Sequence, residues 1–235
     1  MYSLSQKLFA EFIGTFTLVF IGAGAICADQ YLRMNGQVNV GLLAIAIANG
    51  LAMAIMVSAI GHISGGHLNP AITIGFWVTR RLGTFQTLLY WIAQILGALA
   101  ASFLLLTIIP ESVWRPVALG TPDLAPLTDF TRMHAMILEA VLTFILVFVY
   151  FATIVDLRGV ANRLAGFVVG LAITVGTIAA YPFTGAAMNP VRAFGPALAT
   201  RHWSNHGVYW VGPLFGGVLA GVIYDRLFLR DQPPA

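Results

Sequence analysis

Long apolar segments are the feature that most constrains this chain. Six of them recur along the sequence, and each approaches the roughly 20 residues that a helix needs to cross the hydrocarbon core of a bilayer. Helices are expected because lipid offers backbone groups no hydrogen-bond partners, whereas a helix pairs them internally. The sequence therefore predicts six transmembrane helices, at Leu8–Ala28, Val40–Ile60, Phe85–Ile109, Met133–Val155, Leu164–Ala180 and Val208–Phe228.

The charge content agrees with this prediction. Charged residues make up 9% of the sequence, whereas soluble domains usually carry about 25%. The basic residues are scattered between apolar segments, so we expect no nucleic-acid partner. The single cysteine, Cys27, excludes an intrachain disulfide and a multi-cysteine zinc site. The sequence has no evident nucleotide-binding loop, Ser/His/Asp set or histidine spacing for a metal, so we expect no cofactor, no metal and no enzymatic activity.

The first apolar segment has two interpretations. It is long, it contains Glu11, and no basic cluster precedes it beyond Lys7. A cleaved signal peptide is the alternative, but such a peptide has a shorter apolar region and a basic start. We expect a retained first membrane helix.

Two shorter segments, Asn69–Val78 and Asn189–Ala199, cannot span a bilayer as helices. Each begins with Asn-Pro. Asparagine is a preferred N-cap, and proline is favoured at the first helical position because no donor is needed there. A single Asn-Pro is only a turn signal, so surface loops and re-entrant half-helices are both open for one copy taken alone.

The two Asn-Pro segments belong to an internal repeat. Asn69 and Asn189 lie 120 residues apart, and "YWIAQILG", which begins at Tyr90, matches "YWVGPLFG", which begins at Tyr209. Each copy holds three crossings and one half-helix, so the second copy enters the membrane from the opposite side. Inverted repeats with broken helices near the midplane occur in membrane transport proteins. We predict one membrane domain, 1–235, with a first repeat at 1–115 and a second, inverted repeat at 130–235.

The basic residues also predict an orientation. With both termini in the cytoplasm, seven basic residues lie on the cytoplasmic side: Lys7, Arg80, Arg81, Arg158, Arg163, Arg226 and Arg230. The other side has four, with a fifth, Arg192, inside the second short segment. The positive-inside rule favours cytoplasmic termini by a modest margin. The stretch 110–129 is then an outer linker between the repeats.

The paired motifs carry a family resemblance. With "HLNPA" at His67–Ala71 and "MNPVR" at Met188–Arg192, the chain resembles an aquaporin of the major intrinsic protein family over nearly its whole length. The resemblance implies an all-α membrane protein with six transmembrane helices, two re-entrant half-helices and an inverted repeat. It also implies a homotetramer with one pore per subunit. The pore motif then comprises Asn69, Pro70, Ala71, Asn189, Pro190 and Val191, and Val191 stands where the family usually has alanine, which we expect to have a small packing effect.

The electrostatics of a pore fit these residues. Two half-helices from opposite faces would meet N-terminus to N-terminus, and each end carries roughly half a positive charge that repels cations. Asn69 and Asn189 can each offer an N–H donor to a passing oxygen as well as capping a helix. A water molecule held by both donates outward in both directions, which interrupts a chain of proton transfers. Arg192 is costly in a membrane unless it faces water, so we expect it at a constriction.

The resemblance places a selectivity filter at Asn49, Thr177, Ala186 and Arg192. Water-selective members have a bulky aromatic residue and a histidine at the first two positions, and glycerol facilitators have aromatics at the first and third. This chain has neither pattern, and its ring resembles the small-residue filters of metalloid-permeable members. The signals conflict, because Tyr209-Trp210 looks water-type and Ala193 stands where glycerol facilitators have aspartate. We give the filter more weight because it sets the steric limit directly.

Glu11 and Glu139 occupy equivalent places in the repeat, and acids inside a membrane are functional candidates by default. A proton-coupled transporter would use such carboxylates. The resemblance implies instead that they are buried acids that accept backbone N–H bonds from the re-entrant loops. His67, beside the first motif, is expected to support its loop or to face the inner vestibule.

We therefore expect a bacterial-type channel in the inner (plasma) membrane. It would pass water, glycerol and neutral hydroxides of the arsenous or boric acid type, and exclude protons and ions. A strict water channel is the main alternative, if neighbours such as Met53 or Phe183 fill the filter. A proton-coupled secondary transporter and an adhesion or junction protein on the same fold are further alternatives, but the latter would need bulky filter residues.

Overall fold

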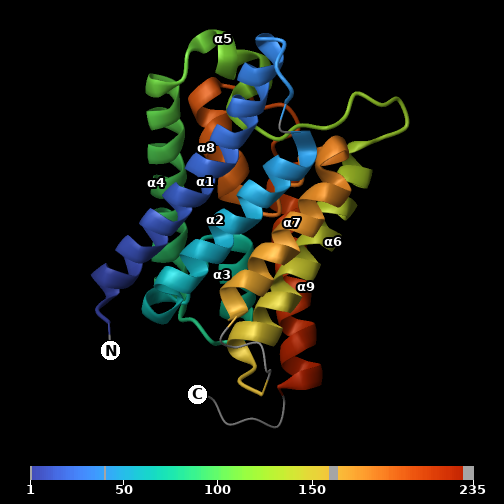
Figure 1. The fold of residues 1–235 in the computed structure, drawn as a ribbon. Coiled ribbons are helices and arrows are strands. Elements are labelled where there is room, and N and C mark those ends of the chain that lie inside the picture. The colour runs from blue at the N-terminus through green and yellow to red at the C-terminus, as the bar shows by residue number, and fades with distance from the viewer. Residues whose placement is uncertain (1, 40, 159–163, 230–235) are drawn as a thin grey trace.

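The computed structural model describes residues 2–39, 41–158 and 164–229, and every regular element within them is helical (Figure 1). Among these residues, six helices are long and apolar enough to cross a membrane. They are α1 (Leu4–Met34), α2 (Gly41–Ser64), α4 (Thr84–Ile108), α6 (Arg132–Tyr150, continued by the π-helical turn η2 over Phe151–Val155), α7 (Ala165–Thr184) and α9 (Val208–Phe228). The predicted fold class is confirmed.

Some helix ends differ from the predicted segments. α1 begins at Leu4 because Ser3 and Gln6 form a capping box, which polar residues outside the apolar segment supply. α7 runs beyond the predicted end at Ala180 and passes through Pro182, although proline lacks a backbone donor. It stops at Gly185, whose φ of 76° is left-handed. Three residues used above, Val40, Arg163 and Arg230, lie outside the described residues.

The two Asn-Pro segments form the short helices α3 (Pro70–Val78) and α8 (Pro190–Thr200). The side chain of Asn69 caps α3 by accepting a bond from Ala71 N at 2.8 Å. The side chain of Asn189 caps α8 in the same way, with Val191 N at 3.1 Å. Each proline occupies the first turn. Both are therefore helices that begin inside the bundle.

The predicted outer linker contains short helical structure that the sequence did not indicate. α5 (Glu111–Trp114) is followed by the 3-10 helix η1 (Arg115–Gly120). Within η1, Ala118 and Leu119 have positive φ angles of 44° and 52°. These left-handed residues turn the chain back over the bundle end that also holds α8 in Figure 1.

The half-helices connect the two repeats crosswise. α3 of the first repeat packs on α9 of the second, and α8 of the second repeat packs on α4 of the first. α2 and α7 pack on each other along the middle, as Figure 1 shows. Small residues permit these close approaches: a Cβ at Gly217 would overlap the carbonyl oxygen of Ala71, and one at Gly195 would lie 2.7 Å from that of Ala98. These contacts lie within one subunit.

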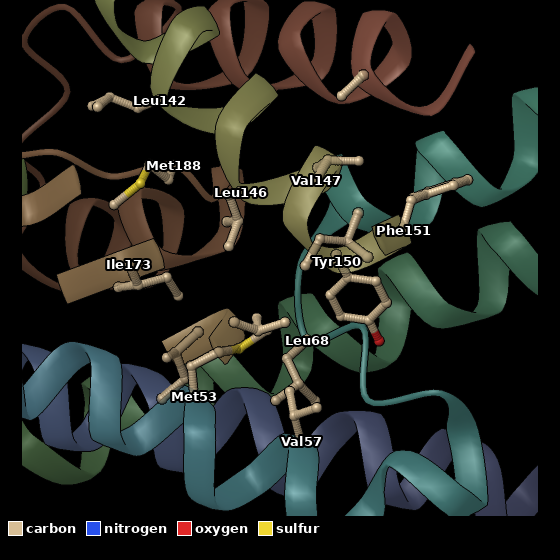
Figure 2. Packing of buried hydrophobic residues seen from close by; sticks show 14 of the residues in the cluster. Met53, Val57, Leu68, Leu142, Leu146, Val147, Tyr150, Phe151, Ile173 and Met188 are labelled. Atoms are coloured by element: carbon tan, nitrogen blue, oxygen red, sulfur yellow. The ribbon is translucent and has the colours of Figure 1, made fainter. Parts of the chain in front are cut away.

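The largest buried cluster fills the centre between the repeats. Met53 from α2 lies near Ile173 from α7, and Val57 from α2 lies next to Leu68 from the loop before α3 (Figure 2). Met188 from the loop before α8 belongs to the same cluster. Leu146 from α6 joins them. The residues that enter the half-helices are thus held by apolar packing from both halves of the chain.

The α3–α9 contact yields a stability prediction. Gly217→Ala places a methyl group on the backbone of Ala71, and such overpacking typically costs about 1–3 kcal/mol. We expect a lower midpoint of thermal unfolding, followed by tryptophan fluorescence in detergent. Gly207→Ala is the control, because a Cβ there meets nothing within 4 Å. Equal midpoints for the two variants would contradict the packing described here.

Candidate functional site

Glu11 on α1 accepts hydrogen bonds from the loop that leads into α3. Its Oε1 accepts from the backbone N–H of His67 at 2.9 Å, and its Oε2 accepts from that of Leu68 at 2.7 Å. Ser64 Oγ also donates to Oε1, at 2.7 Å. The Glu11 side chain is fully buried. The N–H groups of this loop have no helical partners inside the bundle, and Glu11 provides the acceptor that they need.

Glu139 on α6 repeats this arrangement for α8. Its Oε1 accepts from Ala187 N at 2.9 Å and from Thr184 Oγ1 at 2.7 Å, and its Oε2 accepts from Met188 N at 2.8 Å. Every donor lies 120 residues after its counterpart in the first repeat. The two carboxylates have the same local geometry, and Glu139 is also fully buried.

The first repeat has additional partners that sequence reasoning missed. Gln94 on α4 donates through Nε2 to Glu11 Oε2 at 2.8 Å and to Thr73 Oγ1 at 3.0 Å. His67 Nδ1 lies 3.1 Å from Thr73 Oγ1 and is buried, so His67 lies against its own loop and half-helix. The repeat alignment places Pro213 opposite Gln94, so the second repeat lacks this amide.

The two motif asparagines bind each other's loops. Asn69 Nδ2 donates to the carbonyl oxygen of Met188 at 2.8 Å, and Asn189 Nδ2 donates to that of Leu68 at 2.9 Å. Leu68 and Met188 have positive φ angles of 53° and 50°. Each amide group has two N–H bonds, so one remains for a further acceptor. These bonds bring the N-termini of α3 and α8 together.

A narrow cavity with a volume of about 20 Å³ lies at this junction, which is about the space that one water molecule needs. It brings together all four predicted filter residues and both motif asparagines. Apolar side chains complete its wall, and the described lining contains no acidic residue. The lining residues are Leu18, Asn49, Met53, Asn69, Leu146, Ile173, Thr177, Ala186, Ala187, Met188, Asn189 and Arg192. The remaining motif residues, Pro70, Ala71, Pro190 and Val191, are buried behind it in the half-helices.

The predicted filter residues have small side chains apart from Arg192. Asn49 on α2 is 7% exposed, and its Nδ2 donates to the carbonyl oxygen of Ile45 one turn earlier, at 2.8 Å. Thr177 on α7 is 3% exposed, and Ala186 lies in the loop before α8. Of the two neighbours considered as fillers, Met53 lines the cavity, whereas Phe183 is 41% exposed and lies outside the lining.

Arg192 on the first turn of α8 is buried, and its Nη1 donates to the backbone carbonyl of Gly120 at 2.9 Å. No described acidic residue forms an ion pair with it. Its other donors are therefore available to the cavity. The sequence did not indicate a role for Gly120, because every residue type has a backbone carbonyl.

The linker that carries Gly120 is bonded to the last turn of α7 and to the loop after α8. Asp123 accepts from Asn205 Nδ2 at 2.9 Å and pairs with His202 Nε2 at 2.8 Å. Partial burial raises the pKa of Asp123, but the hydrogen bonds from Asn205 and His202 outweigh it and hold the pKa below its usual value. Ala125 N donates to the carbonyl of Phe183 at 2.8 Å. This network fixes the acceptor that holds Arg192.

The family model described as the major intrinsic proteins matches residues 1–224. The chain belongs to this family. Aquaporin TIP4-4 of Zea mays is 45% identical over 228 residues, which cover 96% of this chain and 88% of the relative. Aquaporin TIP4-1 of Arabidopsis thaliana is 45% identical over 233 residues, which cover 97% and 88%.

A solved structure shares the fold. The X-ray structure of the aquaglyceroporin from Plasmodium falciparum superposes with a TM-score of 0.81 at 25% identity and covers 97% of this chain and 98% of that one. The six spans, the two half-helices and the inverted repeat are therefore those of the aquaporin fold. Members of the aquaporin family are channels, so this multi-pass membrane protein is not an enzyme.

The buried carboxylates yield a second prediction. Glu11→Gln and Glu139→Gln each replace an oxygen that accepts an N–H bond with an NH2 group, and a bond to a charged acceptor contributes about 1.5–3 kcal/mol. We expect both variants to unfold at lower temperature while the folded fraction keeps its solute preference. Glu111→Gln is the control, because its side chain is 61% exposed. Normal stability together with a lost dependence on a proton gradient would indicate a transporter instead.

Proposed function

We propose that this protein is a passive transmembrane pore for water and small uncharged solutes that excludes protons and other ions. The observation that carries the proposal is the cavity at the junction of the half-helices, because both motif asparagines and all four filter positions line it. Its wall offers hydrogen-bond donors among apolar side chains. Such a surface replaces the hydration of a neutral polar molecule one contact at a time.

In the proposed pore, positive charge around the cavity excludes cations. The N-termini of α3 and α8 meet at the cavity, and their helix dipoles place positive potential there. Arg192 adds a full positive charge and forms no ion pair with a described acidic residue. The free N–H bonds of Asn69 and Asn189 orient a water molecule as an acceptor, so its own hydrogens point away from the junction and proton transfer is interrupted.

We further propose that the filter is wider and more polar than that of a strict water channel. Asn49, Thr177 and Ala186 leave space that an aromatic ring or a histidine would fill, and Asn49 and Thr177 add hydrogen-bonding groups. Compact molecules rich in hydroxyl groups fit this chemistry: glycerol, and the undissociated hydroxides of arsenic(III), boron and antimony(III).

A strict water channel is the alternative that a specific observation favours. Met53 and Leu18 line the same cavity as Asn49, and both are bulky and buried. If their side chains occupy the space that the small filter residues leave, only water passes.

A proton-coupled transporter is less consistent with the site. Glu11 and Glu139 are fully buried, neither lines the cavity, and each has both oxygens bonded. We propose that they hold the re-entrant loops and that His67 supports the first loop through Thr73. A junction protein without transport would need bulky filter residues, and this chain has small ones.

We also propose that the chain lies in the plasma membrane with both termini in the cytoplasm and forms a homotetramer. The start of α1 and the end of α9 lie at the same end of the bundle (Figure 1), and the excess of basic residues is on that side. An apolar groove between α6 and α9, lined by residues such as Met136, Phe144 and Phe215, suits contact with lipid or with a second subunit.

The proposed filter predicts how solute flux changes when larger side chains are placed in it. Proteoliposomes of the unmodified protein should be permeable to water, glycerol and urea. Light scattering measures this permeability as the change in vesicle volume after an osmotic step. Asn49→Phe combined with Thr177→His should reduce glycerol flux about tenfold, which needs only about 1.4 kcal/mol of added barrier, and should spare water. Leu104→Phe is the control, because Leu104 is 42% exposed on the outside of α4. Unmodified protein that passes water but excludes glycerol, urea and arsenous acid would refute the wide filter.

A further inference from the structure

Asn49 has a position that its small size alone does not explain. Its Nδ2 is bonded to the carbonyl oxygen of Ile45 on its own helix, at 2.8 Å. No described residue donates a hydrogen bond to its Oδ1. An amide at this site can lie against a neighbouring helix or extend into the cavity that it lines, and the two positions leave different apertures.

The neighbouring helix has a recess at this point. A Cβ built on Gly22 of α1 would lie 2.5 Å from Oδ1 of Asn49, 3.3 Å from its Cγ and 3.7 Å from its Nδ2. These three atoms are the nearest neighbours, and all belong to one amide. The Asn49 amide therefore occupies the space that the missing side chain of Gly22 leaves.

The helix itself does not require a glycine at this position. Gly22 lies inside α1 and is not among the glycines with positive φ. Alanine stabilises a helix interior more than glycine does. The close approach of the Asn49 amide is the contact that an alanine would prevent.

We propose that Gly22 is a specificity-determining positioning residue of the filter, because it gives the Asn49 amide a recess in α1 and so holds it at the wall of the cavity instead of further inside. This inference rests on the proposed pore. With a side chain at position 22, the amide must rotate away from α1 toward the cavity that it shares with Thr177 and Arg192. The aperture then narrows for glycerol-sized hydroxylated solutes before it narrows for water.

The test is a double-mutant cycle with Gly22→Ala and Asn49→Ala. Glycerol and water permeability are measured in proteoliposomes with equal amounts of protein, together with the thermal midpoint in detergent. Gly22→Ala alone should lower the glycerol-to-water permeability ratio severalfold. In the Asn49→Ala background the same substitution should leave that ratio unchanged, because no amide remains to be displaced. Gly24→Ala is the matched control on α1, since its Cβ meets only Leu105 Cδ2, at 3.8 Å.

Two results would overturn the inference and leave the pore proposal standing: an unchanged permeability ratio in Gly22→Ala, or an equal fall of the ratio in both backgrounds. If the unmodified protein excludes glycerol, the proposal of a wide filter is wrong, and the double-mutant cycle is evaluated by water permeability alone. Gly22→Ala must then reduce water flux, and the added Asn49→Ala must restore it. If Gly22→Ala assembles poorly, the thermal midpoint must recover in the double variant, and failure to recover would overturn the inference.

Discussion

Two buried carboxylates provide the contact on which the rest of this structure depends. The loop that leads into a half-helix inside the bundle has backbone N–H groups without helical partners, and these groups need an acceptor within the protein. Glu11 and Glu139 accept these bonds at equivalent points of the two repeats. The loops can then place Leu68 and Met188 in left-handed conformations, and the two asparagines can reach across to them.

The hydrogen bonds of Glu11 and Glu139 fix the loops that surround the cavity. The reciprocal asparagine bonds hold two helix N-termini against each other, which concentrates positive potential where the proposed pore passes. Crosswise packing of α3 on α9 and of α8 on α4 means that neither repeat can form the site alone. Arg192, held by the Gly120 carbonyl, adds charge at the proposed filter. Polar groups are thus fixed before a solute arrives, and a small neutral molecule needs no rearrangement to exchange its hydration for them.

The sequence predicted the helices better than the contacts that hold them in place. Long apolar segments and two Asn-Pro starts indicated six spans and two half-helices, because hydrophobic length and N-cap chemistry are local properties of the chain. Helix ends were less predictable: α1 is extended by a polar cap at Ser3, and α7 continues through Pro182. Contacts across the fold were less predictable: the family resemblance implied that Glu11 and Glu139 hold the re-entrant loops, but it indicated no other partner. The Gly120 carbonyl carries no residue-type signal, and Gly22 matters only because the Asn49 amide packs against it.

The central claim is that the facing half-helices and Arg192 pass neutral molecules while they exclude ions. The most direct measurement is proton and potassium flux in proteoliposomes whose water permeability is recorded in parallel, with a pH-sensitive dye inside and an imposed potassium gradient. The account predicts water flux that rises with the amount of protein while ion flux stays at the level of empty vesicles. Ion flux that rises with the protein, and that is abolished by replacing Asn69 or Asn189, would contradict it.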